Sequence, residues 1–477
     1  MISALLILIP LVAGAASFAL RSSDAARRFT LLSALATLGV AIAALMPAFA
    51  ASLSMDLPWL PVMGSRFTLT MDGMSKMLCL LTAISFPLIF ISIYQQNFRS
   101  PGAFYGWMLL SQAGLMGVFL AADALLFYFF WELALIPVYF LCSTWGGERR
   151  IAVTLKFFLY TFVGSLLMLA GIIYLSFQQP AGSFAISDIS QAALRAPHRE
   201  WLFWLFFVAF AIKMPVFPLH TWQPDAYDES PAPVTMVMSG IMVKMGIYAV
   251  VRWLLPLFPQ QGKEFADIII GFSVAGMLYA SFIAMQQNNL RRMIAFSSIA
   301  HIGLMSAALF TYHAGATQGV MLQMFSHGIN VIGLWILADA IEKQTGTRQL
   351  SEMGGLARQA PHLAILLVIM GLANVALPLT NAFIGEFMMF NGLFSYNWVL
   401  AATAGISIIL AAVYTLRMIE KVLYGTPAFP ERAVVDLSPN VKWVLVVLVV
   451  LVLIGGVFPQ PLIDLTKDTV EVLIKNK

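Results

Sequence analysis

Charged residues are scarce in this chain of 477 residues. Only 10% of the residues are Asp, Glu, Lys or Arg, while 60% are hydrophobic. A soluble domain carries roughly 25% charged residues, so the composition excludes one and predicts a polytopic membrane protein. The basic residues are scattered and form no stripe, which argues against a nucleic-acid partner.

Cysteine is also rare. Cys79 and Cys142 are the two cysteines, and each lies in an apolar run without a CxxC motif. The sequence therefore supports neither a disulfide framework nor an iron–sulfur site, and no metal or cofactor site is expected. No segment between the apolar runs is long enough for a soluble catalytic domain, so any redox chemistry is expected to belong to partner subunits.

The apolar runs predict an all-α membrane protein with about fourteen transmembrane helices in a single domain, residues 1–477. A span needs about 20 apolar residues, which places helices near 2–20, 29–51, 74–95, 103–121, 124–143, 152–177, 201–222, 232–255, 266–286, 293–312, 317–340, 362–395, 398–420 and 441–458. The tail Pro459–Lys477 alternates apolar and charged residues, as amphipathic helices do. We expect it to lie on the membrane surface or against a neighbour.

Basic residues predict the orientation of the chain, because cytoplasmic loops are enriched in them. The loops after odd-numbered helices, with their flanking helix ends, hold fourteen basic residues, and the loops after even-numbered helices hold five. The fourteen are Arg21, Arg27, Arg28, Arg99, Arg149, Arg150, Arg291, Arg292, Lys343, Arg348, Arg358, Arg417, Lys421 and Arg432. The five are Arg66, Arg195, Arg199, Arg252 and Lys263. The odd loops are therefore expected in the cytoplasm and both termini on the opposite face.

Two lysines lie inside apolar runs. Lys213 precedes Pro215 and Pro218, which interrupt its helix, and Lys244 lies near the middle of the next run. An ionisable residue at the bilayer centre costs about 2.5–3.5 kcal/mol and usually marks an ion path. Interrupted helices are tolerated there only where protein or water satisfies the backbone, as in transport sites.

Two carboxylates complete the candidate set. Glu132 lies in the run LLFYFFWELALIPVYFL, and Glu386 lies beside a second interruption at Pro378. Each could be a structural hydrogen-bonding group or the partner of a buried cation, and the cost of an unpaired charge favours the second interpretation. Asp72 and Asp123 lie near helix starts, where a carboxylate is expected to cap backbone N–H groups.

The histidines are weaker candidates. His301 and His327 lie in apolar helices, where they could relay protons or simply join helices by hydrogen bonds; axial haem ligation is the least favoured interpretation. His220 follows Pro218 and could be structural or part of an access route. Lys156 could reach the interface with its ammonium group, or could join a relay.

Spacing suggests an internal repeat. Glu132 precedes Lys213 by 81 residues, and His301 precedes Glu386 by 85. The fifth predicted helix then corresponds to the tenth and the seventh to the twelfth. A repeat unit of five helices must be inverted in the membrane, as in many secondary transporters.

Several segments together resemble the antiporter-like membrane subunits of respiratory complex I, NADH-quinone oxidoreductase, and most closely the subunit M type. They include FYFFWELALIPVYFLCSTWGG, AIKMPVFPLHTWQPDAYDESPAP, GIMVKMGIYAVVRW, IAFSSIAHIGLMS, FSHGINVIGLWILADAIE and IGEFMMF. They run in order from about Asp72 to Tyr424. Glu386 favours the M type, because related subunits typically carry lysine there.

The resemblance implies two inverted five-helix halves, helices 4–8 and 9–13, with broken helices 7 and 12. The expected division is 1–101, 102–262, 263–425 and 426–477. It also implies a proton relay in which Glu132 partners Lys213, Lys244 is central, His301 and His327 link the middle, and Glu386 is terminal. This chain departs from the family at the second interruption. The family often reads LPGT followed by Asn-Phe there, whereas this chain reads LPLTNAF, with Leu379 and Ala382 in place of the expected glycine and asparagine.

The function implied is that of a proton-translocating subunit driven by redox chemistry elsewhere, in a bacterial inner membrane. NADH, FMN, iron–sulfur clusters and quinone would belong to partner subunits, and the neighbours would be other complex I membrane subunits and lipid. Alternatives are a subunit of a multi-subunit sodium/proton antiporter or of a membrane-bound hydrogenase-type complex, which share these residues. A purely structural scaffold is disfavoured by the number of buried ionisable residues.

Overall fold

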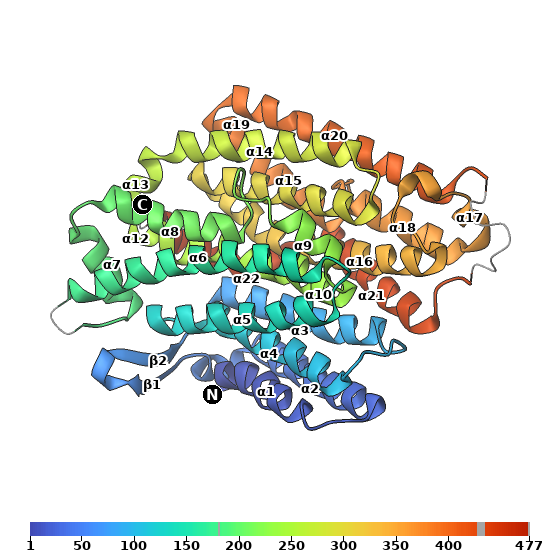
Figure 1. Ribbon diagram of the computed structural model, residues 1–477. Coiled ribbons are helices and arrows are strands. Elements are labelled where there is room, and N and C mark those ends of the chain that lie inside the picture. Colours follow the sequence, from blue (N-terminus) through green and yellow to red (C-terminus); the bar gives the residue numbers. More distant parts are fainter. Residues whose placement is uncertain (180–181, 427–434, 476–477) are drawn as a thin grey trace.

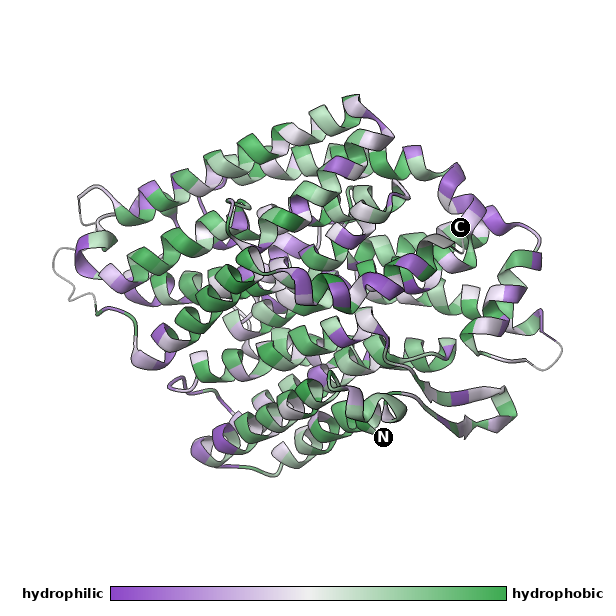
Figure 2. Cartoon of the chain, turned by 180° about the vertical axis from the view of Figure 1, so that it is seen from behind, coloured by the Kyte–Doolittle hydropathy of each residue, from purple (hydrophilic) through white to green (hydrophobic). Residues whose placement is uncertain are grey.

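The structure is a computed structural model that describes residues 1–179, 182–426 and 435–475. Long helices run side by side in one common direction, and their short connections gather at the two ends (Figure 1). Hydrophobic residues cover the helices, while hydrophilic residues concentrate towards the ends and connections (Figure 2). The arrangement is that of a helical bundle built to cross a membrane.

The N-terminal part differs from the prediction in one respect. The second helix ends at Ala43 instead of near residue 51 and is followed by the 3-10 helix η1, and the segment between the second and third predicted helices forms a two-stranded antiparallel hairpin. Pro47, Pro58 and Pro61 explain the difference, because proline disrupts a helix interior. The elements are α1 (Ile2–Ser17), α2 (Ser23–Ala43), η1 (Pro47–Ser52), β1 (Met55–Leu60), η2 (Pro61–Met63), β2 (Ser65–Leu69) and α3 (Gly73–Ser92).

The next part contains the first interrupted helix. It comprises α4 (Pro101–Leu120), α5 (Ala124–Trp145), α6 (Arg150–Phe177), α7 (Ile186–Arg195), α8 (Arg199–Lys213), α9 (Gln223–Glu229), α10 (Ala232–Val237), η3 (Met238–Met242), α11 (Val243–Ala249), η4 (Val250–Leu254), α12 (Leu255–Leu257) and α13 (Pro259–Glu264). The elements from α10 to α12 form one helical span, Ala232–Leu257, in which η3 and η4 are π-helical. Such π segments inside α-helices occur frequently at functional sites.

The remaining elements contain the second interrupted helix. They are α14 (Ala266–Gln286), α15 (Leu290–Phe310), α16 (Ala314–Thr345), η5 (Leu350–Glu352), α17 (Leu356–Gln359), α18 (Pro361–Asn374), α19 (Asn381–Tyr396), α20 (Trp398–Leu423), α21 (Pro439–Val457) and α22 (Gln460–Lys475). The amphipathic tail predicted from the sequence is α22, which packs against α3 and α16 of the same chain.

Within the described ranges, eleven helices are long and apolar enough to cross a membrane. The other three predicted spans are α1, which is shorter, and the two interrupted pairs α8–α9 and α18–α19. The all-α polytopic fold is therefore confirmed, with the hairpin as an addition. The inverted relation between the two halves stays a prediction.

Three spans lie at the centre of the bundle. The most apolar stretches of the span Ala232–Leu257, of α15 and of α16 are buried by other parts of the chain, whereas those of α2 and α21 are mostly not buried. Glycines bring the interrupted helices close to these central spans. A Cβ atom on Gly246 would lie 2.8 Å from the carbonyl oxygen of Phe210 on α8, and one on Gly319 would lie 2.7 Å from the carbonyl oxygen of Gly385 on α19.

Candidate functional site

Lys244 lies at the centre of the bundle, immediately after the π-helical segment η3. Its side chain is fully buried, and its Nζ donates a hydrogen bond of 2.7 Å to the carbonyl oxygen of Ser239. The same Nζ lies 2.8 Å from Nδ1 of His327 on α16. Buried ionisable groups need such partners. Lys244 is therefore joined directly to a group that can accept or donate a proton.

The chain of contacts continues from α16 to α15 and α19. The rings of His327 and His301 lie 5.4 Å apart between centroids, and Nδ1 of His301 lies 3.0 Å from Oε1 of Glu386. The amide of Gln323 donates a 3.0 Å hydrogen bond to the same carboxylate oxygen. Four predicted site residues thus form one row, Lys244–His327–His301–Glu386, which we call the central row.

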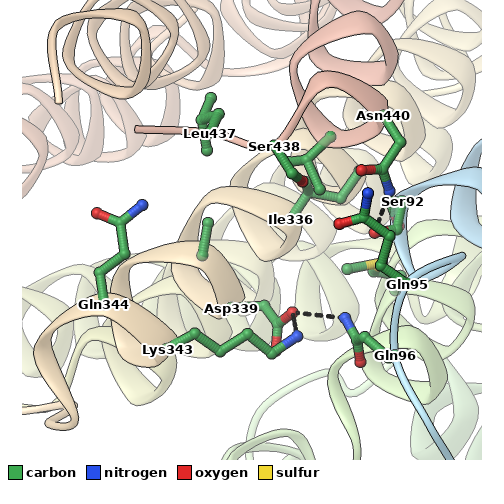
Figure 3. Close-up of a pocket in the computed structure, with 13 residues that line it drawn as sticks. Ser92, Gln95, Gln96, Ile336, Asp339, Lys343, Gln344, Leu437, Ser438 and Asn440 are labelled. Carbon is green, nitrogen blue, oxygen red and sulfur yellow. Dashed lines mark hydrogen bonds and ion pairs between the residues drawn. The ribbon is translucent and has the colours of Figure 1, made fainter. Parts of the chain in front are cut away.

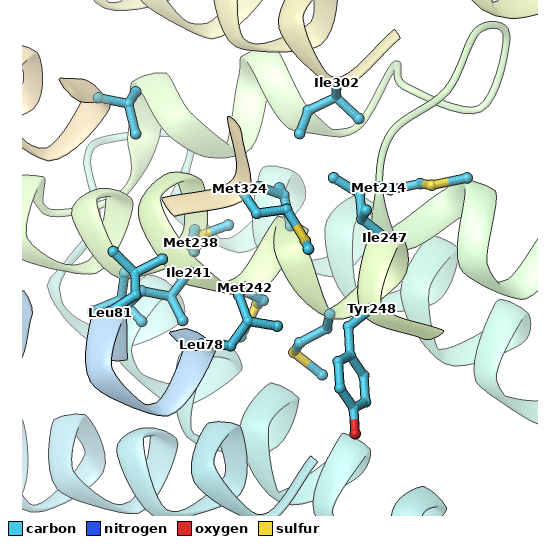
Figure 4. Packing of buried hydrophobic residues seen from close by; sticks show 14 of the residues in the cluster. Leu78, Leu81, Met214, Met238, Ile241, Met242, Ile247, Tyr248, Ile302 and Met324 are labelled. Atoms are coloured by element: carbon cyan, nitrogen blue, oxygen red, sulfur yellow. The ribbon is translucent and has the colours of Figure 1, made fainter. Parts of the chain in front are cut away.

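Apolar side chains surround Lys244. Leu78 and Leu81 of α3, Ile241 and Met242 before it, and Met324 of α16 are buried around this part of the bundle (Figure 4). A low-dielectric surrounding strengthens electrostatic interactions and makes an unpaired charge costly.

Glu132 and Lys213 are brought to the same region but do not form a direct ion pair. In the described part of the chain no ion pair within 4.0 Å joins them, and Lys213 Nζ and Glu132 Oε1 are both buried without a hydrogen-bond partner. Lys213 Nζ lies 5.7 Å from the ring centroid of Trp131, the residue before Glu132. The carboxyl of Glu132 is hydrogen-bonded to Ser165 and interacts electrostatically with Lys213 without a direct ion pair.

Lys156 lies apart from this centre. Its Nζ is 2.8 Å from Asp225 Oδ2 and donates to the carbonyl oxygen of Thr221 at 2.9 Å, and its side chain is 39% exposed. Arg292 binds the other oxygen of Asp225 at 2.7 Å. This geometry matches the interfacial interpretation of Lys156 and does not join it to the central row.

His220 lies in the interruption between α8 and α9. Its ring stacks on Phe217 and meets the edge of Tyr279, at centroid distances of 5.6 and 5.3 Å. Its Nδ1 is buried without a hydrogen-bond partner. The structure therefore places His220 in an aromatic setting, separate from the central row.

The two predicted helix caps are present. Asp72 accepts the backbone N–H of Ser75 at 3.0 Å, and Asp123 accepts those of Leu125 and Leu126. The sequence analysis did not anticipate that Asp72 also pairs with Arg252 at 2.6 Å. These residues are 180 positions apart, so only the fold shows the contact.

Neutral polar residues near the row were also missed. Ser297, one turn before His301 on α15, accepts hydrogen bonds from Asn374 Nδ2 at 3.0 Å and from the Tyr414 hydroxyl at 2.9 Å. Gln323 lies four residues before His327, which could have signalled a shared helix face. Asn374 directly precedes the second interruption, and its position was the available signal there.

Among the described residues no group of three His, Cys, Asp or Glu side chains could hold a metal ion. In the central row, Lys244 contacts His327 and His301 contacts Glu386 through polar atoms, while the two imidazole rings face each other with centroids 5.4 Å apart. Lysine, imidazole and carboxylate groups are all able to bind and release protons.

The comparisons with known proteins agree with this site. Residues 121–411 match the family model described as NADH:quinone oxidoreductase/Mrp antiporter, TM. The chain belongs to this family. All residues of the central row lie within the matched range, as do Glu132 and Lys213.

Two curated relatives place the chain among M-type subunits of this family. NADH-quinone oxidoreductase subunit M of Pseudomonas aeruginosa is 34% identical, and the alignment covers 86% of this chain and 82% of the relative. F(420)H(2) dehydrogenase subunit M of Methanosarcina mazei is 33% identical, with 99% and 98% covered. The subunit M resemblance read from the motifs is confirmed.

A solved structure supports the fold over the entire chain. A chain of respiratory complex I from Thermus thermophilus with bound NADH superimposes with a TM-score of 0.92 at 29% identity. It covers 100% of this chain and 99% of that chain. The chain is therefore a multi-pass membrane subunit of the complex I type.

Proposed function

We propose that this chain translocates protons as the M-type membrane subunit of an NADH-quinone oxidoreductase. The observation that carries the proposal is the central row, in which lysine, two histidines and a carboxylate lie in sequence across three buried spans and α19. Such a row can pass a proton stepwise inside a membrane, where isolated charges are costly.

The driving force comes from outside the chain. Oxidation of NADH, with FMN, iron–sulfur clusters and quinone, is assigned to partner subunits. Moving one charge against roughly 150–200 mV costs about 3.5–4.5 kcal/mol. A displacement of Glu132 relative to Lys213 would change the charge balance beside Lys244, because α8 and α11 are packed at Gly246. We propose this displacement as the coupling step, with Glu132 and Lys213 as its charged pair.

The remaining assignments follow from the same proposal. The chain is a single membrane domain with halves at 102–262 and 263–425, both termini face away from the cytoplasm, and its neighbours are other membrane subunits of a bacterial complex I. Lys156 and His220 are assigned no relay step, because neither contacts the central row.

One observation favours F(420)H(2) as an alternative to NADH as the electron donor of the complex. The relative that matches over nearly its whole length is named for F(420)H(2) rather than NADH. The proton path in this chain would be the same with either donor. Membranes containing the complex, supplied separately with NADH and with F(420)H(2), distinguish the two donors by which one supports electron transfer.

The test of proton translocation is Glu386→Gln in the whole complex. Glutamine keeps the shape and can still bond Gln323 and His301, but it cannot release a proton. We expect NADH-driven acidification of proteoliposomes and quinone reduction to fall together by roughly tenfold, equivalent to about 1.4 kcal/mol.

The matched control is Glu148→Gln, which makes the same chemical change in an exposed loop. The complex must still assemble, as judged by its subunit composition and size. Normal acidification by an assembled Glu386→Gln complex would refute the relay. Acidification supported by an imposed sodium gradient, without electron transfer, would favour the antiporter alternative instead.

A further inference from the structure

Gln323 lies on α16 at a close contact with α19. A Cβ atom on Gly319 would lie 2.7 Å from the carbonyl oxygen of Gly385, so the two helices approach each other there through glycine. Gln323 is one turn after Gly319 on the same face of α16, because residues four apart are neighbours on a helix. Glu386 directly follows Gly385. The helix contact therefore brings the amide of Gln323 to the carboxyl of Glu386, and the two residues are only 1% and 8% exposed.

The two ends of the Gln323 amide have different surroundings. Its Nε2 donates a hydrogen bond of 3.0 Å to Oε1 of Glu386, the same oxygen that Nδ1 of His301 contacts at 3.0 Å. Its own Oε1 is buried, and among the described residues it has no hydrogen-bond partner. Buried polar atoms in folded proteins are nearly always paired, so an unpaired one needs an explanation. The carbonyl of Gln323 is therefore free to accept a hydrogen bond.

An amide can bond to both protonation states of a carboxyl group. A carboxylate only accepts hydrogen bonds, whereas a carboxylic acid also donates one through its O–H, and an amide has both N–H donors and a carbonyl acceptor. A half-turn about the Cγ–Cδ bond of Gln323 exchanges its nitrogen and its oxygen. Gly385 leaves room beside the amide, because a Cβ atom there would lie 3.1 Å from Oε1 of Gln323.

His301 makes the direction of the acid O–H important. If protonated His301 passes a proton from Nδ1 to Oε1 of Glu386, the imidazolium becomes a neutral imidazole and the carboxylate becomes a carboxylic acid. The deprotonated Nδ1 is then an acceptor, so the new O–H can point back to His301 or towards Gln323. A proton that is bonded to the Gln323 carbonyl cannot return to His301 until the amide turns back.

We propose that Gln323 is a positioning residue of the central row, whose amide donates to ionised Glu386 and turns to accept the O–H of protonated Glu386, so that the proton is held away from His301. The proposal rests on the proton-translocating function proposed above. It adds the contact that keeps a transferred proton on Glu386.

The first test is infrared spectroscopy of the detergent-solubilised complex while the pH is lowered to protonate Glu386. Protonation should produce a carboxylic-acid band that the Glu386→Gln variant lacks. When the Gln323 carbonyl gains an O–H donor, its own C=O stretching band should move to lower frequency in the same difference spectrum. This amide shift is assigned with isotopically labelled glutamine, and it should be absent from both Gln323→Met and Glu386→Gln.

Gln318→Met is the matched control for this measurement. Gln318 is a second buried glutamine of α16, but its amide donates to Oγ1 of Thr466 on α22 at 2.6 Å. The amide shift should persist in this variant. An acid band of Glu386 without an amide shift that depends on Gln323 overturns the proposal. Absence of the acid band itself overturns both this proposal and the relay, because Glu386 would then take up no proton.

The second test is NADH-driven acidification of proteoliposomes per quinone reduced. Gln323→Met should lower this ratio by roughly fivefold, the effect of losing one hydrogen bond of ordinary strength, while Gln318→Met pumps like the wild type. If Gln323→Met fails to assemble, Gln323→Asn replaces it, because its amide is one methylene shorter and does not reach the carboxyl. Normal acidification by an assembled Gln323 variant overturns the proposal, whereas the proton-translocating function is decided separately by Glu386→Gln.

Discussion

Lys244 is held by two acceptors with different chemistry. The carbonyl oxygen of Ser239 can only accept a hydrogen bond, whereas Nδ1 of His327 can exchange a proton with the ammonium group. Lys244 therefore has a fixed anchor on its own helix and one route for a proton towards α16.

Substitution of Lys244 by arginine separates charge from proton transfer. Arginine keeps the positive charge but does not deprotonate in proteins. We expect Lys244→Arg to lose NADH-driven pumping by roughly tenfold, about 1.4 kcal/mol, as fully as the apolar variant Lys244→Met. The measurement is acidification of proteoliposomes per quinone reduced.

Normal assembly of the complex is the control for both Lys244 variants. Both variants must give complexes of normal subunit composition, because a larger guanidinium could disturb the packing near His327. Recovery of pumping by Lys244→Arg, but not by Lys244→Met, would mean that the charge alone matters and that no proton passes through this residue.

The residues of the site were predictable from the sequence, but their pairing was not. Lys213, Lys244 and Glu386 were found because an ionisable residue in an apolar run is costly. The partnership of Glu132 with Lys213 stays a prediction, since in the described part of the chain no ion pair within 4.0 Å joins them, whereas Nδ1 of His327 lies 2.8 Å from Nζ of Lys244. Pairing depends on how α5, α8 and α16 rotate about their axes, and periodicity in one sequence does not fix that rotation.

The interruption between α18 and α19 contains two residues in the left-handed region. Ala376 has φ of 56° and Leu379 has φ of 75°. Leu379 occupies the position where the family often has glycine, so the backbone keeps a glycine-like conformation despite the substitution. A residue with a Cβ pays roughly 1–2 kcal/mol for this conformation. The bend is imposed by packing, since the backbone of Leu379 lies against Gly456 of α21.

Leu379→Gly is expected to stabilise the protein. Relief of the left-handed conformation outweighs the greater flexibility of glycine in the unfolded chain, which costs about 0.5–1 kcal/mol. The Leu379 side chain is 69% exposed, so little packing is lost. Thermal denaturation of the detergent-solubilised complex, followed by this subunit's aggregation, should shift upward by one or a few degrees.

Leu377→Gly is the matched control, because Leu377 is also half-exposed but lies outside the left-handed region. It is expected to lower the transition temperature. A lower temperature for both variants would show that the Leu379 side chain makes a contact worth more than the strain.

The start of α18 is capped from a distant loop. Asp436 accepts hydrogen bonds from the backbone N–H of His362 at 2.9 Å and of Leu363 at 3.1 Å, and contacts the His362 imidazole at 2.6 Å. Burial alone would raise the pKa of this carboxyl, but these bonds and that from Leu437 hold the pKa below its ordinary value. The carboxylate therefore stabilises the folded state when it is ionised.

Asp436→Ala is expected to destabilise the protein by about 1 kcal/mol near neutral pH, the usual size of a helix cap. Because the folded-state pKa is depressed, this stabilisation is present above the unfolded pKa of roughly 4 and is lost as the pH falls through the folded-state value. Thermal denaturation of wild type and variant from pH 7 to pH 3 should show transitions that converge below pH 4. A constant difference across this range would contradict the assignment to the carboxylate.

At the scale of the whole molecule, the positions of the helices could be predicted from the sequence, whereas the hairpin and the cavities could not. Fourteen apolar segments follow from composition and length, and the sequence placed nearly all of them. The hairpin β1–β2 was missed because its two strands, Met55–Leu60 and Ser65–Leu69, are short and lie in a segment that the sequence analysis left between two predicted helices. The cavities at both ends of α3 were missed because they are formed by side chains from four or more elements.

Arg252 places a fixed cation between the centre of the molecule and one of its ends. It lines the cavity beside Asp72 and pairs with Asp72 at 2.6 Å, whereas the cavity at the other end is lined by the Asp339–Lys343 pair (Figure 3). An asymmetric barrier is what keeps a pump from leaking, because a proton on Lys244 must not return directly to the side of higher potential. The barrier should be separable from the relay by mutation.

Arg252→Gln is expected to uncouple the molecule without stopping it. Glutamine can still bond Asp72 and Tyr248 but removes the fixed cation that repels protons. Quinone reduction by NADH should continue, while the number of protons accumulated per quinone falls and an imposed pH gradient across proteoliposomes decays faster. Arg66→Gln, which breaks an exposed pair with Asp56 on the hairpin, is the matched control. If Arg252→Gln slows quinone reduction and accumulation in equal proportion, with no faster decay of the gradient, Arg252 acts within the coupled relay and not as a barrier.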